Sequence, residues 1–372
     1  MRVSRADVLA YRVAAQQLHR DSGAAPVELA VLDIGLQDST QVPVELSFTA
    51  RVRDPVDVAE LAGPGKPLAL VWSLRGAPHL HRRAELDTLA AALYPLSEAD
   101  ATARLNETGP SVQRAGIGAL EQYTTAVREL RASVTTPMAK GAASTEVSRR
   151  LPPVMLRDCR TCRARHISDS AMRVALLAAG LELQPDTSPP VLQRRTGAKL
   201  PKRPDLAALS TLLRAYLRLL GPATVSEAAG YFEVRRADAE QAWPGDLVEV
   251  SVDGRTAWIP AENADDLVSP RPPAATRLLG GFDPFLQARD RELLIPDKAA
   301  QKALWPVLGR PGAVLADGEI VGAWRPKTSG RSLTIMVSEF GTIPKPVRGE
   351  LAAEAERVAA SRGMTRVQVA YA

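Results

Sequence analysis

The sequence predicts a mainly helical protein that also contains strands (α+β). Tandem winged-helix units, a helix-turn-helix variant, would precede a C-terminal α+β unit. Groups of helical segments recur along the chain, with apolar residues spaced three and four positions apart. Strand-like residues or a turn accompany each group, and two Asp-Gly pairs lie within hairpin-like sequence. At 372 residues the chain is long enough for several compact units.

The first predicted unit covers residues 1–105. Ser4 is a candidate helix N-cap, and the apolar positions that follow it at helical spacing are Val8, Tyr11, Ala15 and Leu18. A second apolar segment predicts another helix over 27–36, and residues 44–52 are helix or strand. Residues 67–81 predict a strand, a turn and a second strand. Helices followed by a hairpin are the order of a winged helix.

The order recurs in two further predicted units, residues 106–200 and residues 201–270. The second unit's expected elements are a helix over 114–133, a helix over 145–151, a turn or strand over 158–166, and a glycine-capped helix over 168–180. Those of the third are helices over 206–220 and 224–232, a candidate recognition helix over 235–243, and a hairpin over 247–259. The third unit is the clearest winged helix, because Asp253-Gly254 marks its hairpin turn.

The last predicted unit, residues 274–372, follows a proline-rich joint and has more strand character. A second Asp-Gly hairpin is expected over 312–325. The remaining elements are a strand over 333–337, a helix over 347–362 that ends at a glycine, and a strand over 367–371. This mixture predicts an α+β unit.

The charge and cysteine content indicate a class of protein. The net charge is +5 and the sequence pI is about 9.3, with arginine supplying most of the positive charge. Guanidinium groups bind phosphates and base edges, which favours DNA binding, although a GC-rich genome produces the same balance. Two cysteines argue for a reducing compartment, and no signal peptide or membrane-length apolar stretch is evident. We therefore expect a cytoplasmic protein without a membrane partner.

One apolar stretch, residues 31–40, presents candidate catalytic side chains. It breaks at Gly35 and then places Gln37, Asp38 and Ser39 in succession. Polar groups just past a buried segment are held by the core yet open to a ligand. The alternative is that Asp38, Ser39 and Thr40 cap the helix or turn that follows.

Five passages of the chain together resemble a known family. They are Gly35-Leu-Gln-Asp38, Leu74-Arg-Gly-Ala-Pro-His79, the helix pair over 224–243, Phe282-Asp-Pro-Phe-Leu286 followed by Arg289-Asp-Arg291, and the hairpin over 314–325. In their order and spacing they resemble the winged-helix DNA glycosylases of the AlkZ and YcaQ type. The similarity runs over nearly the whole chain.

The resemblance implies winged-helix units in a C-shape around a basic channel for duplex DNA. It implies base excision repair by a monofunctional, cofactor-free and metal-independent monomer, in the bacterial cytoplasm at the nucleoid. The substrates would be alkylated purines in double-stranded DNA, including interstrand crosslinks made by genotoxic antibiotics. The family's catalytic motif is Gln-x-Gln or Gln-x-Asp; Gln37 matches its first position, Ser39 takes the third, and the acid comes one residue early at Asp38.

This departure bears on the chemistry. An N7-alkylated purine is already a cationic leaving group, so the enzyme needs to position a water molecule and stabilise positive charge at the sugar. Gln37 would orient the water and Asp38 would supply negative charge, whereas Ser39 can only hold water. A noncatalytic winged-helix DNA-binding protein, such as a regulator or a damage-binding factor, is the alternative. A third possibility is a chain whose wings bind other proteins.

The candidate DNA contacts are basic residues of turns and loops. They are Arg75, His79, Arg82, Arg83, Arg194, Arg195, Lys199, Lys202, Arg203, Arg289 and Arg291. The resemblance implies that His79 lies near Gln37, where it would touch a phosphate or assist catalysis. A wing-turn histidine with a backbone partner is the alternative.

A cysteine pair and a histidine, Cys159, Cys162 and His166, have zinc-ligand types at near-ligand spacing. A structural zinc site takes four ligands, and the sequence has no second cysteine pair; His79, His81 or Asp158 would have to complete it. Because arginines are interleaved with these residues, the sequence favours reduced thiols in a basic loop over zinc.

Overall fold

The computed structural model describes residues 1–21, 23, 25–39, 43–105, 112 and 114–371. Contacts divide the chain into two compact units. Unit 1 consists of Met1–Val58, Arg214–Ala228 and Gly245–Ala372, and unit 2 consists of Ala59–Leu213 and Ala229–Pro244. The division into the four segments expected from the sequence, and the winged-helix assignment of three of them, remain predictions.

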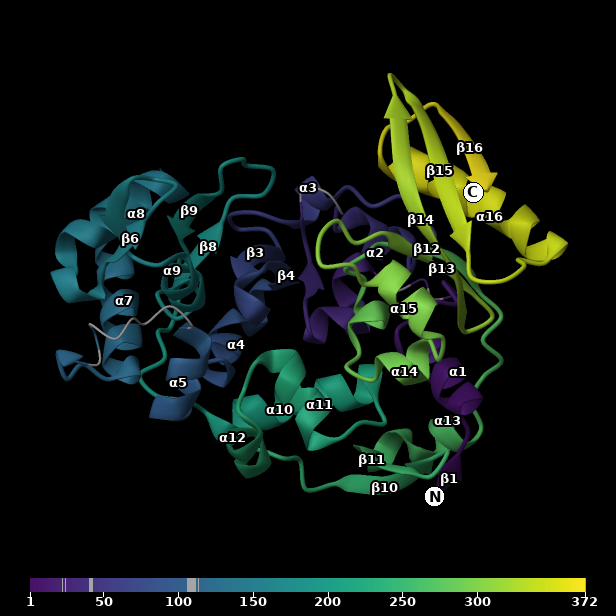
Figure 1. Cartoon of the computed structure of the whole chain (residues 1–372), viewed down its shortest axis with the longest axis horizontal. Coiled ribbons are helices and arrows are strands. Elements are labelled where there is room, and N and C mark those ends of the chain that lie inside the picture. The colour runs from purple at the N-terminus through teal and green to yellow at the C-terminus, as the bar shows by residue number, and fades with distance from the viewer. Residues whose placement is uncertain (22, 24, 40–42, 106–111, 113, 372) are drawn as a thin grey trace. The chain divides into compact units, whose positions relative to one another are not determined.

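Unit 1 contains a sheet with the strand order β12-β13-β14-β15-β16. The strands are β12 (Thr276–Leu279), β13 (Gly312–Ala316), β14 (Glu319–Ser329), β15 (Ser332–Glu339) and β16 (Arg366–Tyr371). Helix α16 (Lys345–Ser361) connects β15 to the parallel strand β16 and packs against the sheet (Figure 1). Leu351 and Val358 of α16 meet Leu278, Val314 and Ile335 in this core. The mixture of helix and sheet predicted for the chain is confirmed.

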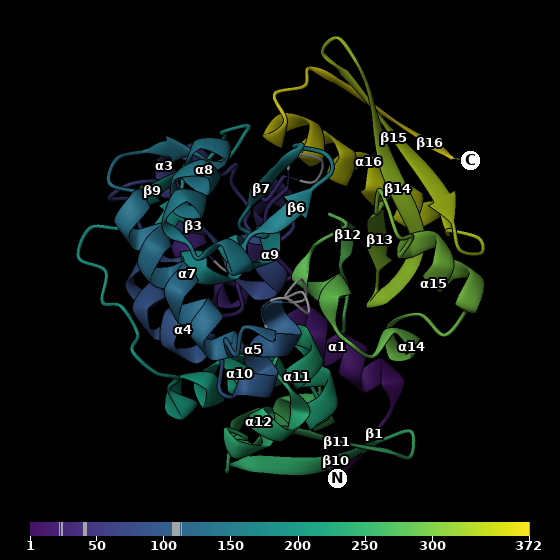
Figure 2. The ribbon, with the colours of Figure 1, turned by 60° about the vertical axis from the view of Figure 1, so that its left-hand side comes forward.

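A second core of unit 1 lies between α1 (Arg5–Ala15) and β13 (Figure 2). Leu9 and Val13 of α1 pack with Leu315 and with Phe285 and Leu294 from the connecting segments. Those segments are η7 (Pro284–Gln287), α14 (Arg291–Leu294) and α15 (Lys298–Leu304). This core fixes α1 against the part of the chain that carries the Phe282–Arg291 passages.

The two Asp-Gly hairpins form where the sequence predicts them. Strands β10 (Leu247–Val252) and β11 (Arg255–Pro260) flank one turn, and β13 and β14 flank the other. Asp253 and Gly254 have φ values of 47° and 89°, and Asp317 and Gly318 have 48° and 84°. Left-handed backbone at both central residues is what a tight hairpin turn requires. The short strand β1 (Arg2–Val3) runs parallel to β10.

Helices complete unit 1. They are α2 (Glu45–Thr49), α13 (Ala264–Val268) and the 3-10 turns η1 (Pro26–Glu28), η2 (Ala30–Asp33) and η6 (Ala261–Asn263). Among the described helices, α3 (Val58–Leu61), α10 (Leu206–Leu220) and α11 (Val225–Phe232) each contain a boundary between the two units along the sequence. The bounds of α10 match the prediction, and the ambiguous residues 44–52 contain the helix α2 rather than a strand.

The helix predicted over 27–36 is wrong. The segment forms η1 and η2, which are separated by Leu29 in an extended conformation with φ −56° and ψ 126°. Gly35, with φ 79°, then turns the chain into the short strand β2 (Leu36–Gln37). Apolar residues at this spacing fit an α-helix and a 3-10 helix alike. The sequence pattern therefore did not show that the segment forms two short 3-10 helices instead of one α-helix.

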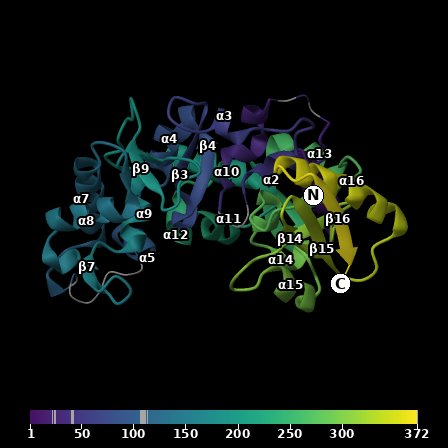
Figure 3. The same cartoon turned by 90° about the horizontal axis from the view of Figure 1, so that it is seen from above.

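Strands β4, β3, β8, β9 and β5 of unit 2 hydrogen-bond in this order, and all their pairings are antiparallel. They are β4 (Pro78–Arg82), β3 (Leu68–Trp72), β8 (Leu181–Leu183), β9 (Val191–Arg194) and β5 (Met138–Ala139). Figure 3 shows β3 beside β4. The predicted strand, turn and strand over 67–81 are confirmed, with η3 (Leu74–Gly76) at the turn.

Helices and a separate hairpin make up the rest of unit 2. The helices are α4 (Leu86–Ala92), α5 (Glu98–Leu105), α7 (Ala119–Ser133), α8 (Lys140–Arg150), α9 (Asp169–Leu176), α12 (Arg236–Gln241), η4 (Arg83–Glu85) and η5 (Pro153–Met155). The hairpin consists of β6 (Arg157–Cys159) and β7 (Ala164–His166). None of the helices in the part of the chain that the structure describes has the length and apolar character to cross a membrane.

Candidate functional site

In unit 1, residues Leu36–Ser39 form what we call the Gln37 ledge. Leu36 is fully buried, as are Leu32 and Ile34 just before it, at 0% exposure. Gln37, Asp38 and Ser39 are half-buried. The predicted catalytic side chains therefore stand between packed hydrocarbon and the surface, on backbone that the core holds in place.

Asp38 also has a scaffold role. Its Oδ1 accepts a hydrogen bond of 3.2 Å from the backbone N–H of Val44, the residue before α2. A carboxylate at the N-terminus of a helix pairs with unsatisfied N–H groups and with the helix dipole. This contact is the capping alternative that the sequence left open for Asp38, and Thr40 lies outside the described residues. The catalytic assignment of the three residues of the motif remains a prediction.

Two buried ion pairs of unit 1 use the acids of the Phe282–Arg291 passages. Arg51, at 0% exposure, donates from Nη1 and Nη2 to Asp283 at 2.7 and 2.8 Å. It also donates to the carbonyls of Ser47 at 3.0 Å and Gln16 at 2.9 Å. Asp283 accepts from the backbone of Phe285 at 3.0 Å. The acid in this passage thus anchors α1, α2 and η7 to one another.

The second pair joins Arg12 of α1 to Asp290. The guanidinium nitrogens are 2.6 and 3.1 Å from the carboxylate oxygens, and Nε donates to the carbonyl of Gly221 at 3.1 Å. Burial lowers the pKa of Arg12, but the Asp290 carboxylate more than offsets this and leaves that pKa above its ordinary value. Sequence reasoning missed both buried arginines. The available signal was an arginine inside an apolar run, as in Tyr11-Arg12-Val13.

Beside these anchored acids, the two predicted DNA contacts of unit 1 are exposed. Arg289 is held through its backbone, whose N–H donates to the hydroxyl of Tyr216 at 3.3 Å. The guanidinium of Arg291 lies over the ring of Trp305 at 4.8 Å from its centroid. Stacking of this kind leaves the edge of the guanidinium able to meet an anion.

In unit 2, the β3–β4 hairpin buries its two histidines. His79 and His81 are 1% and 2% exposed. Nδ1 of His79 donates to the carbonyl of Ala77 at 2.9 Å, and Nε2 of His81 lies 2.9 Å from Oγ of Ser73. Burial, followed by the charge of Arg75, lowers the pKa of His79 well below its ordinary value, and burial lowers the pKa of His81 to about 3. Both rings are neutral near pH 7, and the backbone partner of His79 favours its structural alternative.

The arginines predicted around this turn have protein partners. Arg75, in a left-handed conformation with φ 56°, donates to the carbonyl of Tyr231 at 3.0 Å and lies 5.2 Å from the centroid of its ring. Arg82 pairs with Glu85 at 3.1 Å. Arg83 pairs with Glu182 at 2.6 Å. A left-handed non-glycine residue costs about 1–3 kcal/mol, so the surrounding structure holds Arg75 in place.

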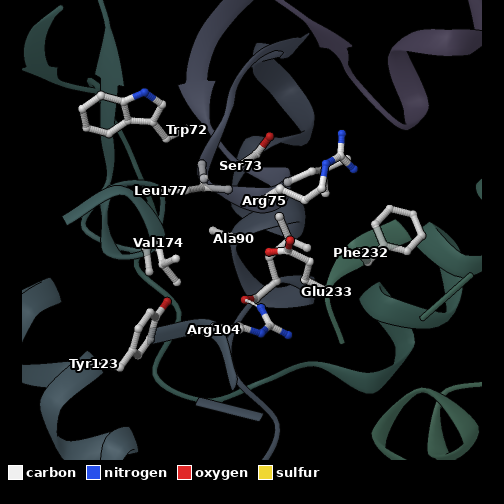
Figure 4. A pocket seen from close by; sticks show the side chains of 14 residues that line it. Trp72, Ser73, Arg75, Ala90, Arg104, Tyr123, Val174, Leu177, Phe232 and Glu233 are labelled. Atoms are coloured by element: carbon white, nitrogen blue, oxygen red, sulfur yellow. Dashed lines mark hydrogen bonds between the residues drawn. The ribbon is translucent and has the colours of Figure 1, made fainter. Parts of the chain in front are cut away.

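A small pocket lies behind the Arg75 turn (Figure 4). Its volume is about 30 Å³, which accommodates one or two water molecules and no nucleobase. The side chains around it include Trp72, Ser73, Arg104, Tyr123 and Glu233. The pocket is therefore not a site for an extruded purine.

The predicted basic loop after β9 has an anchored start and an exposed remainder. Arg194 donates to the carbonyls of Val134 and Arg131, each at 2.8 Å, and Arg195 is buried against Asp87 at 2.8 Å. The side chains that follow are exposed; they are Lys199, Lys202 and Arg203. These three suit contact with a phosphate backbone best.

The thiol and imidazole groups of the β6–β7 hairpin come together in unit 2. The candidate ligand atoms of Cys159, Cys162 and His166 lie within 4.8 Å of one another. Of the further ligands that the sequence offered, His79 and His81 have the partners given above, and Asp158 pairs with Arg165 at 3.4 Å. None of the three belongs to this group.

Comparison with known proteins identifies relatives of this chain. The sequence model of the AlkZ-like DNA glycosylase family matches residues 31–361. A relative from Streptomyces sahachiroi, described as an interstrand DNA cross-link repair glycosylase, is 32% identical over 190 residues. That match spans 46% of this chain and 47% of the relative, about half of its length. The solved structure of the Streptomyces sahachiroi DNA glycosylase AlkZ has a similar fold, with a TM-score of 0.76, 22% identity and full coverage of both chains.

Proposed function

Because this chain belongs to the AlkZ-like DNA glycosylase family, we propose that it hydrolyses the N-glycosidic bond of alkylated or bulky-adduct purines in double-stranded DNA. The observation that carries the proposal is the Gln37 ledge, which lies inside the matched range and holds a half-buried amide on fully buried neighbours. The Streptomyces sahachiroi relative is described as acting on interstrand crosslinks. We therefore include crosslinked duplexes in the proposed substrate class.

The proposed reaction needs no protonation of the leaving base. The oxygen of a water molecule forms a bond to C1′ of the sugar as the C1′–N9 bond breaks. The bonding electron pair leaves with the N7-alkylated purine and neutralises its ring, and the surplus proton of the water passes to solvent. Gln37 orients the water through its amide, and the negative charge of Asp38 stabilises the cationic sugar in the transition state.

The hydrogen bond from the backbone N–H of Val44 to Asp38 supports the electrostatic role of this carboxylate. A carboxylate fixed by a backbone N–H needs little reorganisation when positive charge develops nearby, which is the condition for electrostatic catalysis. Ser39, in the third motif position, would contribute a hydrogen bond to water and no charge. That position is also the observation that favours the second candidate function, a noncatalytic DNA-binding protein.

Release of 7-methylguanine from duplex DNA tests the proposal. We expect the wild-type protein to release the base, and Gln37→Ala to lower the rate about 100-fold, because a misplaced water loses the reacting geometry. Gln287→Ala is the matched control, since Gln287 is another half-buried glutamine of unit 1. Tight DNA binding without release at any enzyme concentration would instead establish the noncatalytic function.

The DNA surface is the second part of the proposal. Both units carry exposed basic side chains. They include Arg289 and Arg291 in unit 1 and Lys199, Lys202 and Arg203 in unit 2. We assign them to phosphate contacts, which give affinity without sequence preference. Action as a monomer in the cytoplasm belongs to the same proposal, and light scattering of the protein with and without DNA tests the oligomeric state.

A further inference from the structure

The β6–β7 hairpin places three metal-binding side chains together. Cys159 ends β6 opposite Ala164, and His166 lies two residues farther along β7, on the same face of the hairpin. Cys162 belongs to the turn between the strands. The two Sγ atoms and a ring nitrogen of His166 lie within 4.8 Å of one another.

The turn is shaped around the sulfur of Cys159. The backbone N–H of Cys162 points at this Sγ with an N–S distance of 3.5 Å, and Arg163 reverses the chain with a left-handed φ of 51°. Backbone N–H groups aimed at sulfur favour the thiolate, which is the form that binds metals.

His166 is oriented as a metal ligand. Its Nδ1 lies 2.6 Å from the carbonyl of Ile167, and a carbonyl can only accept, so Nδ1 carries the proton. The lone pair of Nε2 is then free to bind an electrophile. Nε2 is buried and makes no hydrogen bond with any residue that the structure describes. A buried acceptor left unpaired is unfavourable, and a carbonyl that accepts from the other ring nitrogen is the usual arrangement at a metal-bound histidine.

We propose that Sγ of Cys159, Sγ of Cys162 and Nε2 of His166 bind a zinc ion, with a water molecule in the fourth position. Zinc favours thiolate and imidazole ligands in a tetrahedral arrangement. Ligands at ordinary zinc distances lie roughly 3.5–3.8 Å apart, so a separation of up to 4.8 Å closes with small rotamer changes.

Charge does not oppose this site. Two thiolates and one neutral imidazole exactly balance the double charge of zinc, so the loaded site is neutral. The neighbouring arginines, Arg157, Arg160, Arg163 and Arg165, are therefore not repelled by it. Reduced thiols alone, the arrangement favoured by the sequence, leave the lone pair of His166 without a partner among the described residues.

Zinc content of the purified full-length protein tests the site. We expect one zinc per chain by plasma mass spectrometry, and at least a tenfold loss in Cys159→Ser, Cys162→Ser and His166→Gln. Thr161→Ala, an exposed position in the same turn, is the matched control and should keep the metal. Replacing zinc by cobalt should give the near-ultraviolet absorption of a thiolate-to-cobalt bond in the wild type.

Three results would overturn the proposal. They are a wild-type protein that stays zinc-free after incubation with equimolar zinc, a protein whose mass under non-reducing conditions shows a Cys159–Cys162 disulfide, and a zinc content that His166→Gln leaves unchanged. Should a cysteine variant fail to fold, the cobalt spectrum of the wild type still decides the question. None of these readouts depends on glycosylase activity, so the zinc site and the proposed function stand or fall separately.

Discussion

The α1–α2 region of unit 1 and the β3–β4 hairpin of unit 2 both bury side chains that can carry positive charge, but they treat the charge differently. Arg51 and Arg12 are buried at 0% exposure in ion pairs with Asp283 and Asp290. His79 and His81 have backbone and hydroxyl partners instead, and they are buried as neutral imidazoles.

The difference shows two ways in which a protein can bury a basic side chain. Burying a charge requires a well-placed partner, whereas a histidine can avoid the penalty by losing its proton. Asp283 and Asp290 therefore serve the scaffold as partners of buried arginines. The Gln37 ledge differs from both regions, because its polar side chains are only half-buried.

Removing one member of a buried ion pair should give the largest effect. Arg51→Ala leaves the carboxylate of Asp283, which is itself fully buried, without its counter-charge. We expect the free energy of unfolding to fall by about 3–5 kcal/mol. Chemical denaturation followed by circular dichroism measures the change.

A nearby exposed arginine supplies the control for this experiment. Arg53 donates to the carbonyl of Arg20 at 3.1 Å from an exposed position, so Arg53→Ala should change the free energy of unfolding by less than about 1 kcal/mol. An equal loss of unfolding free energy in Arg51→Ala and Arg53→Ala would show that the buried Arg51–Asp283 pair stabilises the fold no more than an exposed arginine does.

Acid should destabilise the β3–β4 hairpin through its histidines. Burial and nearby arginines keep the pKa of both rings below the ordinary value of 6.5. Below that pH the unfolded chain takes up protons that the folded chain does not, so stability present at neutral pH is lost as the pH falls. The expected slope is about 1.4 kcal/mol per pH unit for each histidine.

The free energy of unfolding, measured by chemical denaturation at several pH values between 6.5 and 5, gives this slope. His81→Leu should reduce it by about 1 kcal/mol per pH unit on average over this range, because burial lowers the pKa of His81 to about 3. An unchanged slope in this variant would mean that His81 takes up a proton in the folded protein as easily as in the unfolded chain. The hairpin of unit 2 would then not bury this histidine as a neutral ring.

The exposed basic loop should give the smallest effect. Replacing Lys199, Lys202 and Arg203 by glutamine removes positive charges that have no anchoring role assigned to them. We expect the slope of log K against log salt for duplex DNA to become shallower by roughly 0.9 per lost phosphate contact. The triple control Lys302→Gln, Lys327→Gln and Lys345→Gln removes the same charge from exposed positions of unit 1. If both triple variants change the slope equally, the loop has no particular DNA role.

Local sequence signals predicted much of the fold. The two Asp-Gly turns have the left-handed backbone that their residues suggest, and α10 begins and ends where its apolar spacing does. The signals failed at the stretch before the ledge, where apolar spacing fitted a helix but the chain forms two short 3-10 turns. They also placed the start of α8 five residues late, at Thr145 instead of Lys140, because this helix has little amphipathic pattern.

Long-range contacts could not be predicted from one sequence. No local pattern indicates that Arg12 pairs with Asp290, 278 residues later, or that an acid near a resemblance motif supports α1. For the same reason the sequence could not decide whether Asp38 caps a helix or takes part in catalysis. Its contact with the backbone N–H of Val44 is visible only in the structure. The hairpin spacing of Cys159 and His166 was visible, but the carbonyl that fixes the tautomer of His166 was not.

The Arg51–Asp283 pair has a consequence for synthesis of the protein on the ribosome. Its two members are 232 residues apart, so at ordinary translation rates Arg51 emerges roughly 10–50 s before its counter-charge. Most of unit 2 is translated within that interval and can collapse first. Val8 and Tyr11 of α1 can pack against Val250 and Leu267 once these are made, but truncation anywhere before Asp283 leaves Arg51 without its counter-charge.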